Sequence, residues 1–221
     1  MEKLKTYYQR HLPHYQPPDA EYHVFCFRLA GSLPPEVIER LRKEREEREK
    51  HIAGMGSVQS RADEWHAHQE AYFEKFDALL DGMTSGPRWL QESAIADLVA
   101  GAIHYRDTKE FDLLAFTIMP NHVHLVYSTV GRNNIPTNVG SRNNIPTYKI
   151  LQSLKRHTAR KANLILHRGG AFWQEESYDH VIRDGEELER TIWYVLNNPV
   201  KAGLVESWEQ WQWTYVKRGM V

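Results

Sequence analysis

The chain is poor in cysteine: its 221 residues contain only Cys26, so it cannot form an intramolecular disulfide. It also has no apolar run long enough to span a bilayer, and its polar and aromatic first residues do not resemble a signal peptide. With 41% hydrophobic and 26% charged residues, it has the composition of a globular domain with a substantial core. We therefore expect a protein of the reducing cytoplasm with no membrane partner.

Acidic residues are missing from the whole of residues 113–174, although the net charge of the chain is only −1. A net charge near zero argues by itself against a nucleic acid as partner, whereas a long block of one sign favours an anionic ligand. The basic residues of this block are Arg132, Arg142, Lys149, Lys155, Arg156, Arg160, Lys161 and Arg168.

Within this block, residues 119–126 read Met-Pro-Asn-His-Val-His-Leu-Val and lie between two segments rich in strand-forming residues. The proline–asparagine pair is typical of a turn between antiparallel strands. Because strand side chains alternate between faces, His122 and His124 share one face and Val123 points into a core. Two adjacent imidazoles supply half the coordination shell of a divalent metal; the other interpretation is an alternating strand with two exposed histidines.

A first strand is predicted over residues 22–29, and a helical, charged insertion over 35–86 follows it. In residues 36–50 no apolar residue follows Leu41, and six acidic residues are interspersed with six basic ones. This helix is expected to be solvated, and its balanced charge makes an arm that binds nucleic acid the less favoured interpretation. A second, amphipathic helix is predicted over 62–80.

The hexapeptide Arg-Asn-Asn-Ile-Pro-Thr occurs twice, at 132–137 and at 142–147. Two polar copies are too few for a repeat fold, so we expect a flexible duplicated loop over residues 130–147. The loop adds two arginines and no acidic residue, and it is either a neutral insertion or a weak DNA contact.

The last long helix is predicted to begin after Asp184 and to end near Asn197, before Pro199. Asp184 and Glu187 have the spacing of a capping box. The remaining predicted elements are helices over 89–105 and 148–166, a strand over 178–183, and a tail whose Trp208, Trp211 and Trp213 dock on the core.

Tyr194 and Asn198 lie four residues apart at the end of this last helix. That spacing puts both side chains on one side of the helix if its last turn is regular. A phenol and an amide oxygen beside two imidazoles suit the cleavage of a phosphodiester: His122, His124 and Asn198 would hold a metal ion, and Tyr194 would attack the phosphorus. The residues alone do not bring this helix to that strand.

A set of motifs occurs in the same order in the REP-associated tyrosine transposases, which are host-adapted relatives of the single-tyrosine, HUH-motif insertion-sequence transposases. The chain resembles this family over about residues 22–34 and 87–206. The motifs are Met-Pro-Asn-His-Val-His-Leu at 119–125, Ser-Leu-Lys-Arg at 153–156 with Thr-Ala-Arg at 158–160, Phe-Trp-Gln at 172–174, His-Val-Ile-Arg at 180–183, and Asn-Pro-Val-Lys-Ala-Gly-Leu-Val at 198–205.

The resemblance implies an α+β, ferredoxin-like sandwich, with a central antiparallel sheet that carries the HUH motif and helices packed on one face of the sheet. We expect a single domain over residues 1–221, in which 35–86 is a helical insertion after the first strand and 130–147 is the duplicated loop.

The resemblance also implies roles for individual residues. His122 and His124 match the metal-binding histidines, and Asn198 stands where related enzymes supply a third ligand, often as Gln. Tyr194 matches the nucleophile, ahead of the competing Tyr178 and Tyr148.

The implied activity is that of a metal-dependent tyrosine transposase, which nicks and joins single-stranded DNA at hairpins of repetitive extragenic palindromes (REP elements). It would act through a 5′-phosphotyrosine intermediate with Mg²⁺ or Mn²⁺, as a monomer or a homodimer, in the cytoplasm and associated with the nucleoid. The residues expected to contact DNA are Lys155, Arg156, Arg160, Arg183 and Lys201.

Other functions stay open. A catalytically silent protein that binds DNA hairpins would retain the same fold, and a replication initiator or relaxase would share the chemistry in a longer chain. A histidine-triad nucleotide hydrolase needs a third histidine where this chain has Val126. A purely structural metal site would need four strong ligands.

Overall fold

The structure is a computed structural model that describes residues 7–9, 13–15, 21–129 and 147–221. The chain divides into two compact units, one formed by 1–30 together with 88–221 and the other by 31–87. The second unit nearly coincides with the predicted insertion. The predicted duplicated loop lies outside the described residues, except for Thr147.

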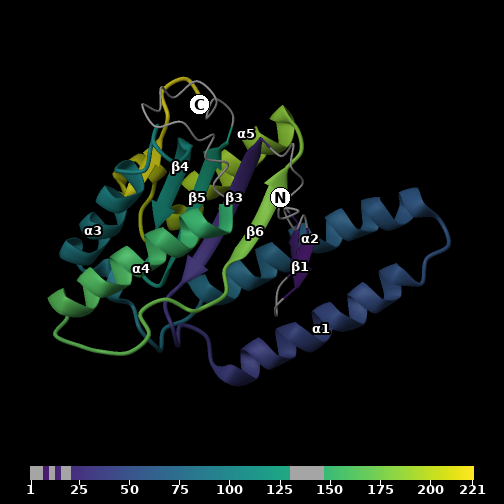
Figure 1. The fold of residues 1–221 in the computed structure, drawn as a ribbon, viewed down its shortest axis with the longest axis horizontal. Helices are drawn as coiled ribbons and strands as arrows, with labels where there is room; N and C mark the ends of the chain where they lie inside the picture. Colours follow the sequence, from purple (N-terminus) through teal and green to yellow (C-terminus); the bar gives the residue numbers. More distant parts are fainter. Residues whose placement is uncertain (1–6, 10–12, 16–20, 130–146) are drawn as a thin grey trace, which may run out of the picture. The chain divides into compact units, whose positions relative to one another are not determined.

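The larger unit is built on the strands β3 (Tyr22–Arg28), β4 (Asp112–Ile118), β5 (His122–Ser128), β6 (Tyr178–Ile182) and β7 (Thr214–Val216). They form one antiparallel, five-stranded sheet in the order β6-β3-β5-β4-β7 (Figure 1). The histidine pair therefore lies on the middle strand, as predicted. A separate two-stranded sheet pairs β1 (Tyr7–Gln9) with β2 (Pro13–Tyr15).

The helices of this unit follow the predicted order along the chain. Among the described residues, none of the helices combines the length and the apolar character that a membrane span needs. They are η1 (Trp89–Gln91), α3 (Ser93–His104), α4 (Thr147–Ile165), α5 (Gly185–Leu196), α6 (Asn198–Lys201) and η3 (Trp208–Gln210).

Both faces of the sheet are covered by helices. α3 and α4 pack on the face of Val123 and Leu125, in a cluster that includes Leu154 of α4. α5 packs on the opposite face, where its Ile192 joins a second cluster with Val126. Figure 1 shows α3 and α4 on one side of the strands and α5 on the other. The expectation of helices on one face was wrong, because both faces carry apolar side chains that must be buried.

The hairpin of β4 and β5 is the one predicted from the sequence, and its turn is held by the chain on either side of the 31–87 unit. Within the turn, the Met119 amide donates to the His122 carbonyl at 2.8 Å. The Leu29 amide donates to the Asn121 carbonyl at 2.8 Å, and the Leu90 amide donates to the Pro120 carbonyl at 3.2 Å. The segment that leads into the histidine pair is therefore fixed from both sides.

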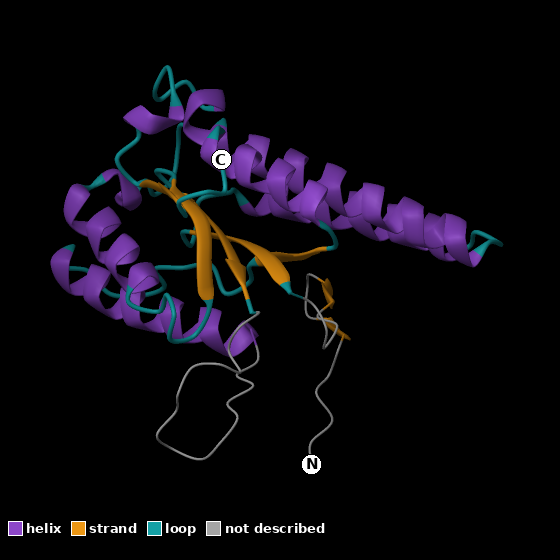
Figure 2. Ribbon diagram, turned by 90° about the horizontal axis from the view of Figure 1, so that it is seen from above, coloured by secondary structure: helices purple, strands orange, loops and turns teal. Residues whose placement is uncertain are grey.

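The 31–87 unit consists of α1 (Pro35–Ala53) and α2 (Val58–Asp81), which lie side by side (Figure 2). Its charges are paired along the helices, as predicted for a solvated segment: Arg42 binds Glu39 at 2.7 Å and Glu46 at 2.6 Å. Further ion pairs join the two helices, Lys75 with Glu44 and Arg48 with Glu64. Such exposed pairs contribute little individually to stability.

The two ends of this unit meet at Gly31 and Gly86. Gly86 has a φ of +86°, and a Cβ there would lie 2.9 Å from the Gly31 carbonyl oxygen. We expect Gly86→Ala to lower the free energy of unfolding by about 1–3 kcal/mol, because it adds both backbone strain and a clash.

Urea unfolding followed by circular dichroism measures this loss. Gly56→Ala is the matched control, because a Cβ at Gly56 would meet nothing within 4 Å. Equal unfolding midpoints for the two variants would contradict the close approach of Gly86 to Gly31.

Candidate active site

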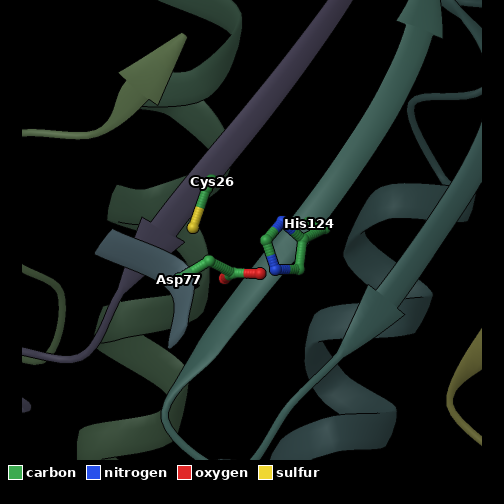
Figure 3. A group of neighbouring side chains, drawn as sticks. All are labelled: Cys26, Asp77 and His124. Carbon is green, nitrogen blue, oxygen red and sulfur yellow. The ribbon is translucent and has the colours of Figure 1, made fainter. Parts of the chain in front are cut away.

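The surroundings of His122 and His124 are determined by the strands on either side of β5. In the sheet register, Cys26 of β3 and Thr117 of β4 lie opposite His124, and Arg28 of β3 lies opposite His122. Directly opposed residues of antiparallel strands point to the same face, so these side chains join the imidazoles on the α5 side of the sheet. All five side chains are buried, and Figure 3 shows Cys26 and His124 on their adjacent strands.

Asn121 orients the ring of His122. The His122 Nδ1 lies 2.7 Å from the Asn121 Oδ1. An amide oxygen can only accept a hydrogen bond, so Nδ1 carries the proton and the lone pair of the neutral ring lies on Nε2. This is how protein sites commonly fix the tautomer of a metal-binding histidine.

The two imidazoles converge through the same type of atom. Nε2 of His122 lies 3.0 Å from Nε2 of His124, and the ring planes are at 90° to each other. Two nitrogen ligands that each lie about 2.1 Å from one ion, with an N–metal–N angle of about 90–110°, would be about 3.0–3.4 Å apart. The pair therefore has the spacing of two neighbouring ligands of one cation.

α5 and α6 bring the third and fourth predicted residues to this pair. Asp184 caps α5 by accepting the Glu187 amide at 2.8 Å, and Asn197 keeps a helical conformation (φ −81°, ψ 0°) between the two helices. The chain thus continues almost as one helix, which places Tyr194 and Asn198 on the same side.

The resulting contacts join Tyr194 and Asn198 to the histidine pair. Asn198 is buried, and its Nδ2 lies 3.3 Å from the Nε2 of His124. The ring centroid of Tyr194 lies 6.2 Å from that of His124, with the planes at 87°. The structure therefore brings His122, His124, Asn198 and Tyr194 together, while their roles as ligands and nucleophile stay predictions.

The chemistry of these donors fits a divalent cation. A 180° rotation of the Asn198 amide would direct its oxygen instead of its nitrogen at His124, giving two imidazole nitrogens and one carbonyl-type oxygen. Three protein donors leave positions open for other ligands, as in catalytic rather than structural sites.

Four of the five residues predicted to contact DNA have exposed side chains: Arg156, Arg160, Arg183 and Lys201. The ammonium of Lys201 lies 3.7 Å from the centroid of the Tyr194 ring, which is a cation–π contact. A positive charge is therefore held directly beside the candidate nucleophile.

Lys155, the fifth predicted DNA contact, is placed differently. Its ammonium donates to the carbonyls of Gln174 at 2.6 Å and Glu175 at 2.8 Å, and to the Ser177 hydroxyl at 3.0 Å. These acceptors match the three N–H groups of an ammonium. Burial, together with the charge of Arg28, lowers the pKa of Lys155 to about 8. This placement favours a structural role, tying α4 to the segment before β6, over the predicted DNA contact.

Glu187 forms a buried network that differs from the predicted capping box. Its carboxylate accepts hydrogen bonds from His180 Nε2 at 2.6 Å and from the Arg183 amide at 3.0 Å. In a standard capping box the glutamate would accept from the amide of Asp184. The network joins β6 to α5 and leaves the guanidinium of Arg183 at the surface, 3.4 Å from Glu187.

Sequence reasoning missed Cys26 and Arg28 as neighbours of the histidine pair. Their signal was present, because a thiol and a guanidinium occupy alternate positions of a strand whose Val24, Phe25 and Phe27 are apolar. Which strand lies beside β5, and in which register, is not readable from either strand alone.

Comparison with known proteins supports the resemblance that the motifs indicated. Residues 89–198, which are 110 of the 221 residues, match the family model described as "Transposase IS200 like". The matched region contains His122, His124, Tyr194 and Asn198, and the match confirms the resemblance to transposases.

A related protein of Haemophilus influenzae, a candidate REP-associated tyrosine transposase, is 25% identical over 118 residues. The aligned part covers 52% of this chain and 65% of the relative, so the match spans less than two thirds of that protein.

Two solved structures show only low similarity. One, a REP-associated tyrosine transposase bound to a REP hairpin, has 13% identity and a TM-score of 0.49, covering 97% of this chain and 82% of that chain. The other, a candidate transposase of Deinococcus radiodurans, has 14% identity and a TM-score of 0.31, covering 90% and 98%.

The lowered pKa of Lys155 predicts a pH-dependent stability. A lysine whose pKa is about 8 in the folded state and about 10.5 in the unfolded state binds more protons when unfolded, so the free energy of unfolding rises as the pH increases from 8 to 10.5. We expect this rise to be smaller in Lys155→Met. Urea unfolding at several pH values measures it, with Lys161→Met, an exposed site on the same helix, as control. Parallel pH profiles for wild type and Lys155→Met would contradict the prediction.

Proposed function

We propose that the protein is a transposase that nicks and rejoins single-stranded DNA at a hairpin, with Tyr194 as nucleophile. The observation that carries this proposal is the convergence of His122, His124 and Asn198, with the Tyr194 ring beside them. The family match of residues 89–198 supports the reaction class.

His122, His124 and the amide oxygen of Asn198 would hold the divalent cation. Bound there, the ion would polarise the scissile phosphate as a Lewis acid. Mg²⁺ or Mn²⁺ suits phosphate oxygens, and the imidazoles favour Mn²⁺ over Mg²⁺. Asn121 contributes by fixing the His122 tautomer, as its 2.7 Å hydrogen bond indicates.

Tyr194 would attack the phosphorus through its phenolic oxygen. The Tyr194 O–P bond forms, the bond from phosphorus to the 3′ oxygen breaks, and the phenolic proton is transferred overall to the leaving 3′ oxygen. The product is a 5′-phosphotyrosine and a free 3′-hydroxyl. Because the covalent link retains the energy of the broken diester, joining to another 3′ end needs no nucleotide. Lys201, 3.7 Å from the Tyr194 ring centroid, would help to hold the ring and a nearby phosphate.

The DNA would follow the exposed cations Arg156 and Arg160 of α4, Arg183 after β6, and Lys201 after the tyrosine. Phosphate contacts of this kind supply affinity without reading sequence, so hairpin choice needs further contacts. We propose REP-type palindromes as the natural hairpins, from the name of the Haemophilus influenzae relative. The protein would act as a monomer or homodimer in the cytoplasm, associated with the nucleoid.

The second candidate is a silent hairpin-binding protein with the same fold. The 3.0 Å contact between the two Nε2 atoms disfavours it, since that geometry serves a cation rather than DNA binding alone. A histidine-triad hydrolase is also disfavoured, because Val126, at the position of its third histidine, lies in an apolar cluster.

Changing Tyr194 to Phe tests the nucleophile. With Mn²⁺ and a labelled hairpin oligonucleotide, wild type should form a covalent adduct that survives denaturing electrophoresis, and Tyr194→Phe should form none. Hairpin affinity should change by less than about threefold, because the ring is retained.

Tyr178→Phe is the matched control, since it removes the phenol of a competing tyrosine on β6 and should still form the adduct. An adduct in Tyr194→Phe would place the nucleophile elsewhere. Hairpin binding by wild type without any adduct would establish the silent protein instead.

Removing Arg156 and Arg160 together tests the DNA path. The double change to Gln should weaken hairpin binding and lower the slope of log affinity against log salt by about 1.4–1.8, the value for two lost phosphate contacts. Cleavage in a single turnover at saturating DNA should be unchanged. Arg40→Gln with Arg218→Gln, two exposed arginines outside the path, is the matched control. An unchanged salt slope for the α4 variant would exclude these two contacts.

A further inference from the structure

Cys26 lies beside the candidate cation site and has no role in the function proposed above. It is opposite His124 in the register of β3 and β5, so both side chains point to the same face of the sheet. Its Sγ lies within 4.8 Å of a ring nitrogen of His124, and Figure 3 shows the two side chains close together.

The surroundings of Cys26 differ from those of a cysteine that only fills a core. The side chain is 1% exposed, yet Cys26 belongs to neither apolar cluster of the described residues. Its neighbours across the strands are His124 on β5 and Tyr178 on β6. The thiol is thus buried next to a nitrogen donor.

The distance is within reach of shared coordination. Ligands at about 2.3 Å for sulfur and about 2.1 Å for nitrogen lie about 3.6 Å apart in a tetrahedral site and at most about 4.4 Å apart on opposite sides of an ion. The 4.8 Å limit exceeds the tetrahedral separation by at most about 1.2 Å, which coordination would close by a rotation about the Cα–Cβ bond of Cys26. Because the backbones of β3 and β5 are already paired at this position, no strand has to move.

We propose that Cys26 supplies a thiolate ligand to the cation held by His122 and His124, so that the site binds thiophilic divalent ions such as Zn²⁺ or Co²⁺ more tightly than Mg²⁺. Thiolate with imidazole is a typical donor set for such ions, whereas Mg²⁺ prefers oxygen ligands. Binding would displace the thiol proton to solvent. The inference rests on the proposed function and specifies the class of its cation.

Cobalt spectroscopy of the full chain tests the inference without an activity assay. Co²⁺ added to metal-free protein should give visible d–d bands and, in the near ultraviolet, the intense charge-transfer band of a thiolate–cobalt bond. Since Cys26 is the sole cysteine of the chain, any such band reports on this residue alone.

Two variants complete the experiment. Cys26→Ser, which is nearly isosteric, should lose the charge-transfer band and bind Co²⁺ at least about tenfold more weakly. His122→Ala with His124→Ala should lose the same band, because the thiolate binds the ion together with the imidazoles. Cys26→Ser should leave Mg²⁺ affinity unchanged, since Mg²⁺ gains little from sulfur. Circular dichroism verifies folding, and the wild-type band remains informative if a variant does not fold.

The outcomes separate the two proposals. Visible bands that depend on the histidines but come without a thiolate band would overturn the role of Cys26 and leave the cation site standing. Absence of any Co²⁺ binding that depends on His122 and His124 would overturn both. A thiolate band that persists in the double histidine variant would also overturn the inference, because Cys26 would then bind the ion elsewhere.

Discussion

The two-residue repeat of the β5 side chains is the constraint on which the site depends. Val123 and Leu125 are buried on one face, and this fixes His122 and His124 on the other. A slip of β5 by one residue would exchange the faces and place the imidazoles in the apolar cluster that α3 and α4 cover. The hydrophobic effect thus orients the polar site: the free energy gained by burying the apolar side chains holds the histidines in place. The turn reinforces this, since Leu29 and Leu90 bind it from both sides.

The second layer of the site comes from a helix that is interrupted only slightly. Pro199 at the start of α6 cannot donate a backbone hydrogen bond. Asn197 nevertheless keeps helical dihedral angles, so the helical path continues from α5 into α6. Tyr194 and Asn198 therefore stay on the same side of it. The apolar side of α5, with Ile192 and Val195, packs on the sheet and sets the height of the phenol and the amide above His124. One stripe of the helix, with Ile192 and Val195, thus packs on the sheet, and the neighbouring stripe carries Tyr194 and Asn198.

Much of this arrangement was predictable from the sequence, because the strong periodicities of β3, β5, α4 and α5 are local signals. What was missed depends on contacts between distant segments. The three-residue strand β7 exists only through pairing with β4, and Lys155 looked like a solvated cation until the chain near Gln174 was found to supply its acceptors. Cys26 likewise became a neighbour of His124 only through the register of two strands. The histidines, Tyr194 and Asn198 were predicted as a set because family motifs join them, whereas their spacing along the chain does not.

The meeting of Gly31 and Gly86 at the two ends of the helical unit has a consequence for insertions and deletions. A segment whose ends touch can gain or lose whole helical turns at its far tip without altering the spacing of the elements that flank it. Adding or removing helical turns at the far tip of the α1–α2 pair would therefore leave the strand before the pair and the helix after it at the same separation.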